Sequence, residues 1–452
     1  MTKPTSFSLA LGILAVTSSA QAEVILPSVL SSHMVLQREA PLHIWGTADP
    51  KEKVTVKFSG KTYNTVAKED GNWLVGLPAF KADGGQKHTL TVAGKNTIIL
   101  EDILIGDVWI GSGQSNMEWS LKGTEQGKKS INEANHPQIR LFHIPKVQAN
   151  APAPNVKAKW NSCTPQTIPN FSAVLYHFGK EIHEETDVPM GLINSSWGGS
   201  PIEPWIVTDT TSGKMYNGMI APITQFEVRG TIWYQGETNV IQKNGLAYRE
   251  KMKALIEGWR TAFENKDMPF YFVQIAPWGN ERYATGQLPA LWEAQCATLK
   301  IPHTGMAVTT DIVHDIKDIH PRNKRDVGNR LASWALAKNY KKEGVVYSGP
   351  LYKSIKIEGG KIRIAFAHVA KGLKSRDGNP LNEFQIAGAD EKFVPAEASI
   401  DGATIVVSAK NVNHPKHVRF GWHRSANPNL INSGGLPASP FQSKNWSGGT
   451  GE

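Results

Sequence analysis

A serine and a histidine that lie far apart in the chain have the neighbours that ester hydrolysis needs. Ser115 lies in the sequence GQSNM at residues 113–117, directly after an apolar, strand-like run. His320 follows Asp318 by two positions, and Asp315 stands a little further back. A hydrolytic serine requires a base, a group that orients this base, and donors for the developing oxyanion. Ser115, His320 and one of the aspartates could supply the first parts of such a site.

Neither motif decides the chemistry when it is taken by itself. The serine motif is not the G-x-S-x-G elbow of the α/β-hydrolases, because Met117 stands where the second glycine would be. Ser115 could equally be a small polar residue in a turn. His320 could be a surface or capping residue, or it could be a general base whose tautomer is fixed by a neighbouring carboxylate.

Two further loops carry groups that could stabilise an oxyanion. Gly198 and Gly199 in SSWGGS could present a backbone N–H or could simply form a turn. Asn239 in QGETN could offer its side-chain amide. The alternative for Asn239, as for Gln235 and Glu237, is strand-end capping and hydrogen bonding within the core.

The elements that must position these loops alternate between strand and helix from about residue 101. Strands are predicted at ILIGDVWIG, MGLINSSWGG, RGTIWYQGE, PFYFVQIAPW and TGMAVTTDI, and helices at FSAVLYHFGKEIHEET, AYREKMKALIEGWRTAFE and residues 323–340. This alternation predicts a mainly parallel sheet covered by helices. The carboxyl ends of parallel strands meet at one edge, so the loops at 112–116, 194–200, 235–239 and 311–320 are expected to converge there.

Short β segments occupy both flanks of this region. Val54, Val56 and Phe58 alternate as one face of a half-buried strand, and Asp70-Gly71 predicts a hairpin turn. After about residue 345 the β pattern returns, as a second all-β domain or as an extension of the first.

Six segments, in order, resemble the sialate O-acetylesterase family of carbohydrate esterases, within the SGNH hydrolases. They are LPSVLSSHMVLQREAPLHIWGTADPKEKVTV, DVWIGSGQSNMEW, GLINSSWGGSPIEPW, YNGMIAP with TIWYQGETN, DIHPRNKRDVGNRLASWAL, and GLPASPFQSKNW. In the SGNH pattern the serine, glycine, asparagine and histidine come from four successive blocks, and the same order occurs here. The resemblance covers most of the chain after residue 22.

The resemblance implies roles for individual residues. Ser115 would be the nucleophile and His320 the base, and the oxyanion hole would use Ser115, Gly198 or Gly199, and Asn239. The broader SGNH pattern places aspartate at the position of Lys317, but the D-x-H spacing of Asp318 and His320 resembles the narrower family. The resemblance therefore implies Asp318 as the orienting residue. Asp315 or a backbone carbonyl are the alternatives. The residues expected to bind substrate are Gln114, Trp197, Asn217, Gln235, Glu237 and Arg322. No metal and no cofactor are expected.

The N-terminal segment, the charge and the cysteines indicate the cellular compartment and exclude some classes of partner. Lys3, an apolar run over residues 9–16 and the sequence AQA at 20–22 predict a signal peptide, and hence export to a periplasm or the medium. No later segment is apolar enough to span a membrane.

The net charge of +9 is spread over the chain, without the basic blocks that nucleic-acid binding needs. Cys163 and Cys296 permit one disulfide in an oxidising compartment. The sequence does not set the oligomeric state.

Together these observations predict an exported serine esterase that removes O-acetyl groups from sugars or oligosaccharides. O-acetylated sialate is the first substrate candidate, and acetylated xylan or xyloglucan oligosaccharides are the alternative. A non-catalytic carbohydrate-binding protein on a hydrolase fold, or an exported protease or lipase, are the alternatives of other classes. The expected fold is α/β: a three-layer α/β/α, flavodoxin-like SGNH domain at 101–343. It follows a signal peptide at 1–22 and an N-terminal β domain at 23–100, and it precedes a C-terminal β-rich domain at 344–452, both β parts being sandwich-like.

Overall fold

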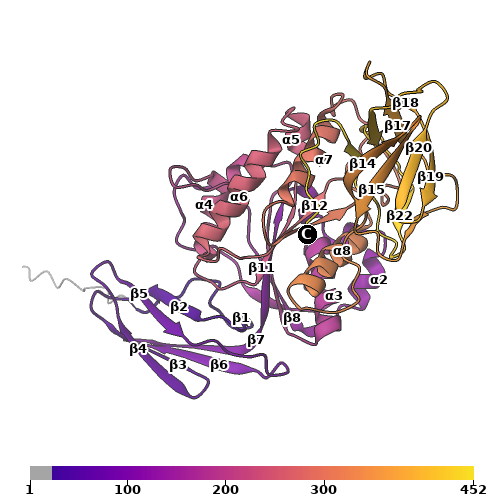
Figure 1. Cartoon of the computed structure of the whole chain (residues 1–452). Helices are drawn as coiled ribbons and strands as arrows, with labels where there is room; N and C mark the ends of the chain where they lie inside the picture. Colours follow the sequence, from indigo (N-terminus) through magenta and orange to yellow (C-terminus); the bar gives the residue numbers. More distant parts are fainter. Residues whose placement is uncertain (1–22, 452) are drawn as a thin grey trace, which may run out of the picture.

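A computed structural model describes residues 23–451 of the chain. The predicted signal peptide at residues 1–22 lies outside these residues. A β-rich part comes first, alternating strands and helices follow, and a second β-rich part ends the described chain (Figure 1).

The middle of the molecule is built on a sheet with the strand order β13-β12-β11-β7-β10-β8-β9. Neighbouring strands run parallel, except that β9 at the edge is antiparallel to β8. The mainly parallel sheet predicted from the sequence is therefore confirmed. The bounds are β7 (Thr97–Gly113), β8 (His136–His143), β9 (Trp160–Cys163), β10 (Met190–Ser196), β11 (Gly230–Tyr234), β12 (Phe270–Gln274) and β13 (Thr304–Val308).

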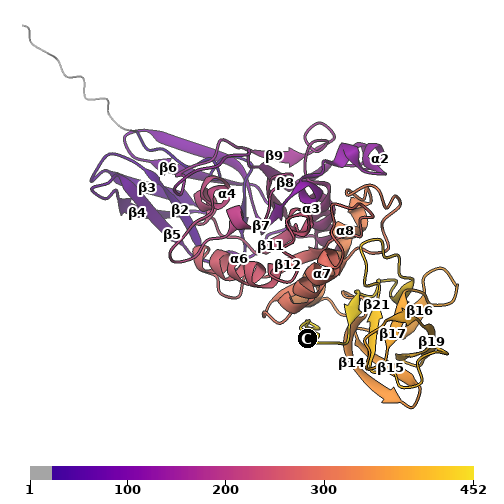
Figure 2. The ribbon, with the colours of Figure 1, turned by 90° about the horizontal axis from the view of Figure 1, so that it is seen from above.

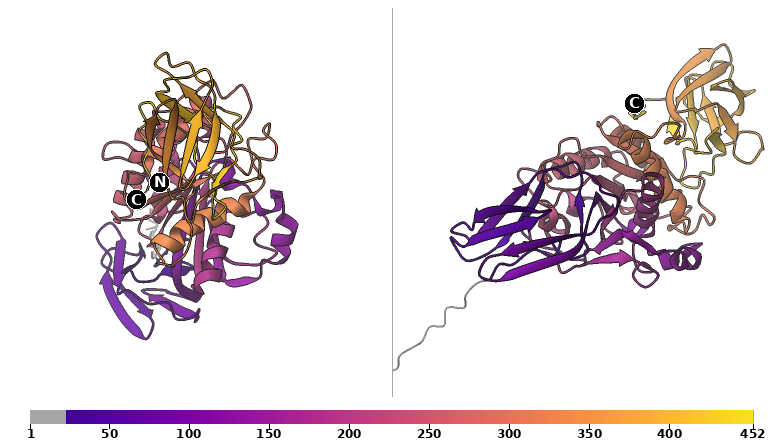
Figure 3. Two further views of the ribbon diagram at one scale, coloured as in Figure 1. Left: turned by 45° about the vertical axis from the view of Figure 1, so that its right-hand side comes forward. Right: turned by 90° about the horizontal axis from the view of Figure 1, so that it is seen from below.

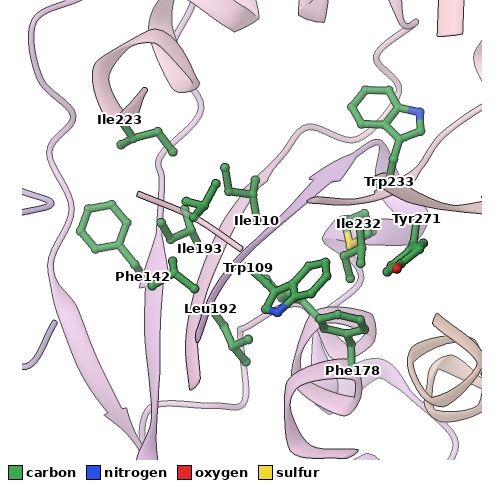
Figure 4. Packing of buried hydrophobic residues seen from close by; sticks show 14 of the residues in the cluster. Trp109, Ile110, Phe142, Phe178, Leu192, Ile193, Ile223, Ile232, Trp233 and Tyr271 are labelled. Atoms are coloured by element: carbon green, nitrogen blue, oxygen red, sulfur yellow. The ribbon is translucent and has the colours of Figure 1, made fainter. Parts of the chain in front are cut away.

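Helices pack on both faces of this sheet through large aromatic side chains. On one face Trp109 of β7 meets Phe178 of α3 (Ala173–Thr186), with ring centroids 4.9 Å apart (Figure 4). α8 (Lys324–Lys338) packs beside α3. On the other face Trp233 of β11 meets Trp259 of α6 (Tyr248–Ala262) at 6.1 Å, and α7 (Gln287–Thr298) packs beside α6. The shorter helices are α1 (Ser115–Glu118), α2 (Gly127–Asn132), α4 (Lys214–Met219) and α5 (Glu237–Ile241).

The N-terminal β-rich part is joined to the central sheet by a single strand. β7 pairs with β6 through its first residues and with β10 and β11 through its later ones, so it crosses the boundary predicted at residue 100. Buried side chains of the two parts form one hydrophobic cluster. The remaining strands are β1 (Val35–Gln37), β2 (Leu42–Thr47), β3 (Lys53–Phe58), β4 (Lys61–Val66), β5 (Asn72–Leu77) and β6 (His88–Ala93).

Two expectations for this part have opposite outcomes. Val54, Val56 and Phe58 of β3 are buried between more exposed neighbours, as their alternation predicts. The hairpin predicted at Asp70-Gly71 is wrong, because β4 pairs with β3 whereas β5 pairs with β2. Gly71 does adopt a turn conformation, with φ +81°, but the turn passes the chain from one sheet to another.

The C-terminal β-rich part has its own hydrophobic cluster and lies to one side of the central sheet (Figures 2 and 3). After its last strand the chain returns to the helical layer, where Gly449 N–H donates to Cys296 O at 2.8 Å. The division of the chain at 100 and 343 stays a prediction. The strands are β14 (Leu351–Glu358), β15 (Lys361–Ala367), β16 (Leu373–Ser375), β17 (Phe384–Ala387), β18 (Val394–Pro395), β19 (Glu397–Asp401), β20 (Thr404–Ser408), β21 (His417–Phe420), β22 (Leu430–Asn432) and β23 (Phe441–Gln442).

Cys163 and Cys296 do not form a disulfide, although an oxidising compartment would permit one. Cys163 in β9 and Cys296 in α7 are both free and buried. Between residues 23 and 451, no helix combines the length and the apolar character needed to cross a bilayer.

Candidate active site

Ser115 stands at the carboxyl edge of the sheet, where β7 gives way to the short helix α1. Gly113 makes this turn with φ +134°, and a Cβ at this position would lie 2.2 Å from the carbonyl oxygen of Tyr234. Only glycine fits so close to the neighbouring strand. Because Ser115 is the first residue of α1, its backbone N–H has no acceptor within the helix.

The imidazole of His320 reaches this serine from a loop 205 positions further along the chain. His320 Nε2 lies 2.9 Å from Ser115 Oγ, within hydrogen-bond distance. The indole of Trp119 stacks on the imidazole, with centroids 4.7 Å apart and an interplanar angle of 25°. Trp119 is itself fixed by a 3.0 Å hydrogen bond from Nε1 to Gly123 O. The structure therefore brings the predicted serine and histidine together and holds the ring in place.

Asp318 is the aspartate that accompanies this histidine. Its Oδ1 accepts a 2.8 Å hydrogen bond from the backbone N–H of His320 and lies 3.7 Å from His320 Nδ1. Asp315, the alternative, accepts instead from the backbone N–H of Lys317 at 2.9 Å. The same oxygen of Asp318 therefore binds the loop backbone and faces the imidazole.

Burial is the main influence on the protonation of His320. It lowers the pKa of the imidazole from its ordinary 6.5, and the cation of Lys324 lowers it further, while Asp318 opposes both effects. A lowered pKa keeps the ring neutral at neutral pH, and a neutral imidazole is the form that accepts a proton from a hydroxyl.

Beneath the serine and histidine, three polar side chains form a buried network. Asn116, next to the serine, accepts a hydrogen bond from Lys324 Nζ and donates one to Glu237 Oε1 at 2.5 Å. Asn116 also donates to the carbonyl of Ile319 at 3.1 Å, which ties the serine loop to the histidine loop. Burial lowers the pKa of Lys324 to about 7 and raises that of Glu237.

The predicted oxyanion donor Gly198 is already engaged. Its backbone N–H donates to Glu118 Oε2 at 2.5 Å, and the other oxygen of Glu118 pairs with Lys146 at 2.5 Å. A Cβ on Gly198 would lie 3.5 Å from Ser115 Cβ, so the glycine loop does lie against the serine. Gly199 is exposed and has φ +76°.

Asn239, the other predicted donor, is also engaged by protein groups. Its Nδ2 donates to both carboxylate oxygens of Glu203 at 3.2 Å. Its Oδ1 accepts from Ile202 N–H and from Gln235 Nε2. In this arrangement the amide holds the loop after β10, and its part in an oxyanion hole stays a prediction.

Four of the predicted substrate-binding residues are buried and bound to protein groups. Gln114, Asn217, Gln235 and Glu237 are at most 3% exposed. Gln235 Nε2 donates to Gln114 Oε1 at 3.0 Å, and Asn217 Nδ2 donates to the carbonyl of Ala149 at 3.2 Å. Gln114 and Gln235 join two loops in this way, whereas Asn217 Oδ1 and Glu237 Oε2 have no hydrogen-bond partner among residues 23–451. A substrate contact by any of the four side chains stays a prediction.

The other two predicted substrate-binding residues remain accessible. Trp197 is partly exposed and its backbone N–H donates to Gly113 O at 3.0 Å, beside the serine turn. The Arg322 side chain is 65% exposed, with Nε 3.9 Å from Asp318 Oδ2. These two side chains are therefore open to a ligand near His320.

Comparison with known proteins assigns the chain to a family. The family model described as "Carbohydrate esterase, sialic acid-specific acetylesterase" matches residues 105–337. The chain belongs to this family of carbohydrate esterases. It is similar to the sialate O-acetylesterases of Homo sapiens (28% identity) and Pongo abelii (29%), each match covering 92% of this chain and 91% of the relative. It is also similar to the solved structure of a carbohydrate acetylesterase from Xanthomonas citri, with 39% identity, a TM-score of 0.90, and coverage of 94% of this chain and all of that one.

The candidate site contains three contributors that the sequence did not single out. Trp119 stacks on the histidine, Glu118 binds the glycine loop, and Lys324 supports Asn116. Glu118 and Trp119 directly follow the serine motif, and this position could have indicated that they belong to the site. Lys324 is one of several cations near the start of α8, and no local pattern shows which of them is buried.

Proposed function

We propose that this protein is a serine esterase that removes O-acetyl groups from carbohydrates through an acetyl-enzyme. The observation that carries the proposal is the 2.9 Å approach of His320 Nε2 to Ser115 Oγ, in a chain of the carbohydrate esterase family. Nucleophile and base within hydrogen-bond reach are the arrangement that covalent ester hydrolysis requires.

The reaction proceeds in two halves. Ser115 Oγ attacks the acetyl carbonyl while its proton passes to His320 Nε2. The tetrahedral intermediate then expels the sugar oxygen, which takes that proton and leaves as an alcohol. In the second half water attacks the acetyl-enzyme and gives one proton to His320. Ser115 Oγ then leaves with that proton, and the acetic acid released loses its remaining proton to solvent as acetate.

The oxyanion of each tetrahedral intermediate forms beside the start of α1. The N–H of Ser115 is the first donor, because it has no acceptor within the helix. Gly198, Gly199 and Asn239 are the further donors that the SGNH resemblance suggests. For Gly198 to take part, its N–H must be released by Glu118, and for Asn239 its amide must be released by Glu203. Asp318 is the proposed partner of the imidazolium, with an oxygen 3.7 Å from Nδ1.

O-acetylated sialate is the proposed substrate. The names of the human and Pongo abelii relatives support this choice. A sialate carries a carboxylate, and the exposed guanidinium of Arg322, next to Asp318 in the histidine loop, is a cation that such a group can reach. Acetylated xylan or xyloglucan oligosaccharides are neutral and would not use this charge.

We further propose that the hydrolase part is a three-layer α/β/α SGNH domain over residues 101–343. It would lie between β-rich domains at 23–100 and 344–452. The residues 1–22 would act as a cleaved signal peptide, so that the mature enzyme works in the periplasm or outside the cell.

A release assay tests the substrate and the class of activity together. Acetate release is measured from O-acetylated sialic acid and from acetylated xylo-oligosaccharides, with the wild type and with Ser115→Ala. The proposal predicts release from the sialate by the wild type and loss in the variant. Release from the xylo-oligosaccharides only would indicate that the substrate is a neutral acetylated glycan. Release from neither, with binding retained, would indicate a carbohydrate-binding protein. Casein cleavage or a preference for long acyl esters would indicate a protease or a lipase.

A further inference from the structure

A cavity of about 650 Å³ lies at the junction of the helical layer and the C-terminal β-rich part. Residues 446–451 of the returning tail form one wall, and the segment 299–304 before and at the start of β13 forms another. Ser115 follows the carboxyl end of β7, whereas β13 begins at this cavity. Because the strands are parallel, the cavity lies at the opposite edge of the sheet from the proposed active site.

The charges on the cavity wall are of one sign. Lys300, Lys338, Lys341 and Lys353 line it, and the lining includes no aspartate or glutamate among residues 23–451. Lys338 Nζ lies 4.5 Å from the ring centroid of Tyr347. Within the described chain, the other three ammonium groups form no ion pair. Several like charges around one cavity attract an anion.

Aromatic rings form the floor of the same cavity and are fixed by packing. Tyr352 stacks on Phe441, with centroids 4.5 Å apart, and Trp446 packs against the edge of Tyr352 at 5.8 Å. Tyr271 is held by a 2.5 Å hydrogen bond from its hydroxyl to Asn339 Oδ1. Tyr271 and Tyr352 are only 1% and 8% exposed, so these two rings form a fixed wall, and the partly exposed Trp446 is the ring that can offer apolar contact to a ligand.

The tail that closes the cavity is tied to two different parts of the molecule by two neighbouring residues. Gly449 N–H donates to Cys296 O at 2.8 Å, and Thr450 O lies 2.7 Å from His368 Nε2. The wall is thus anchored to α7 on one side and to the C-terminal β-rich part on the other. The cavity is a built feature of the junction and does not depend on a loose chain end.

We propose that this cavity binds a carboxylate-bearing saccharide, at a site separate from the esterase centre. The volume lies within the range of small-molecule sites and suits one or two sugar rings. The lysines would meet the carboxylate as compact cations, and the exposed part of Trp446 would meet a C–H face of the sugar. The proposal does not depend on the esterase activity: it would hold an acidic glycan on the enzyme whether or not that glycan is acetylated.

Calorimetry with an oligogalacturonate and with its methyl ester tests the proposal. The two saccharides share their rings and differ in charge, and neither carries an acetyl ester. We expect saturable, salt-sensitive binding of the acid by the wild type, and binding at least about tenfold weaker for the ester. The triple variant Lys300→Gln/Lys341→Gln/Lys353→Gln should lose a similar factor. A matched variant, Lys57→Gln/Lys61→Gln/Lys81→Gln, neutralises exposed lysines of the N-terminal part and should bind like the wild type.

Hydrolysis of an aryl acetate supplies the control for folding and for the location of the site. Both triple variants should hydrolyse it at the wild-type rate, and the oligogalacturonate should not inhibit it. The proposal is overturned if the acid does not bind, or if acid and ester bind equally. It is also overturned if the cavity variant retains wild-type affinity, if inhibition shows that the saccharide occupies the esterase site, or if inorganic phosphate binds as tightly as the saccharide.

Discussion

The backbone N–H of Gly198 donates a 2.5 Å hydrogen bond to Oε2 of Glu118. Glu118 closes α1, the helix that Ser115 begins, and Gly198 lies in the loop that follows β10. This bond therefore joins the helix of Ser115 to the glycine loop, and the ion pair with Lys146 holds the other carboxylate oxygen in place.

Removing this carboxylate should slow the enzyme. In Glu118→Ala the glycine loop loses its charge-assisted hydrogen bond, and we expect kcat for an aryl acetate to fall about tenfold, the equivalent of about 1.4 kcal/mol. Glu118→Gln retains an acceptor and should lose less. Glu125→Ala removes an exposed partner of His314 and serves as the control. An increase in kcat for Glu118→Ala would show that the carboxylate blocks an oxyanion donor instead of positioning the loop.

The two aspartates before the histidine should differ in their effect on catalysis. Asp318→Asn removes the carboxylate 3.7 Å from His320 Nδ1 and should lower kcat by about ten- to a hundredfold, because the imidazolium loses its nearest counter-charge. Asp315→Asn alters only a turn around Lys317 and should stay within about twofold of the wild type. Equal kcat values for Asp318→Asn and the wild type would leave a backbone carbonyl as the orienting group.

The acid limb of the pH–rate profile should lie below the ordinary histidine value. His320 must be neutral to act as a base, and its pKa is lowered from 6.5 by burial and then by Lys324. The midpoint of kcat/KM on the acid side should therefore fall below pH 6.5, where Lys324, with a pKa of about 7, is largely protonated.

Neutralising Lys324 tests the cause of this shift. In Lys324→Met the repulsion that disfavours the imidazolium is gone, so the pKa of His320 should rise and the acid limb should move to higher pH. Arg325→Met, at an exposed neighbouring position, changes the same formal charge where solvent screens it and should leave the midpoint in place. A limb that moves to lower pH in Lys324→Met would contradict the proposed electrostatics.

The ion pair between Asp102 of β7 and Arg140 of β8 should matter for stability and not for chemistry. The guanidinium of Arg140 is 1% exposed and donates to both oxygens of Asp102 at 2.9 Å. Asp102→Asn leaves this cation without its counter-charge, and the free energy of unfolding should fall by about 3–5 kcal/mol. Asp401→Asn breaks an exposed pair with Arg363 and should cost less than about 1 kcal/mol. Urea unfolding of the two variants measures the difference, and equal losses would refute the assignment.

The sequence predicted the sheet and the meeting of its loops because both follow from local patterns. Apolar runs and caps such as Asn323 indicate the strand at residues 190–196 and the helix at 324–338. The convergence of Ser115 with His320 follows from the rule that parallel strands end at one edge. These inferences need no knowledge of how individual side chains pack.

The sequence could not show whether Gln114, Gln235 and Asn217 bind substrate or hold loops together. A glutamine next to a catalytic serine contacts substrate in one fold and holds a loop in another, and only the burial of the side chain separates the two cases. The Asp70-Gly71 turn was misread for a similar reason, since a turn sequence does not specify which strands pair. Edge strand β9 lacks a distinctive pattern, because its four residues WNSC alternate weakly.

The covalent intermediate on Ser115 is the most direct test of the account. An aryl acetate with an isotopically labelled acetyl group is mixed rapidly with the enzyme, the reaction is quenched with acid, and peptides are examined by mass spectrometry. The account predicts a labelled acetyl group on Ser115, a burst of released phenol before steady turnover, and neither in Ser115→Ala. A Ser115→Ala variant that still releases acetate at the wild-type rate, or a label found on another residue, would contradict it.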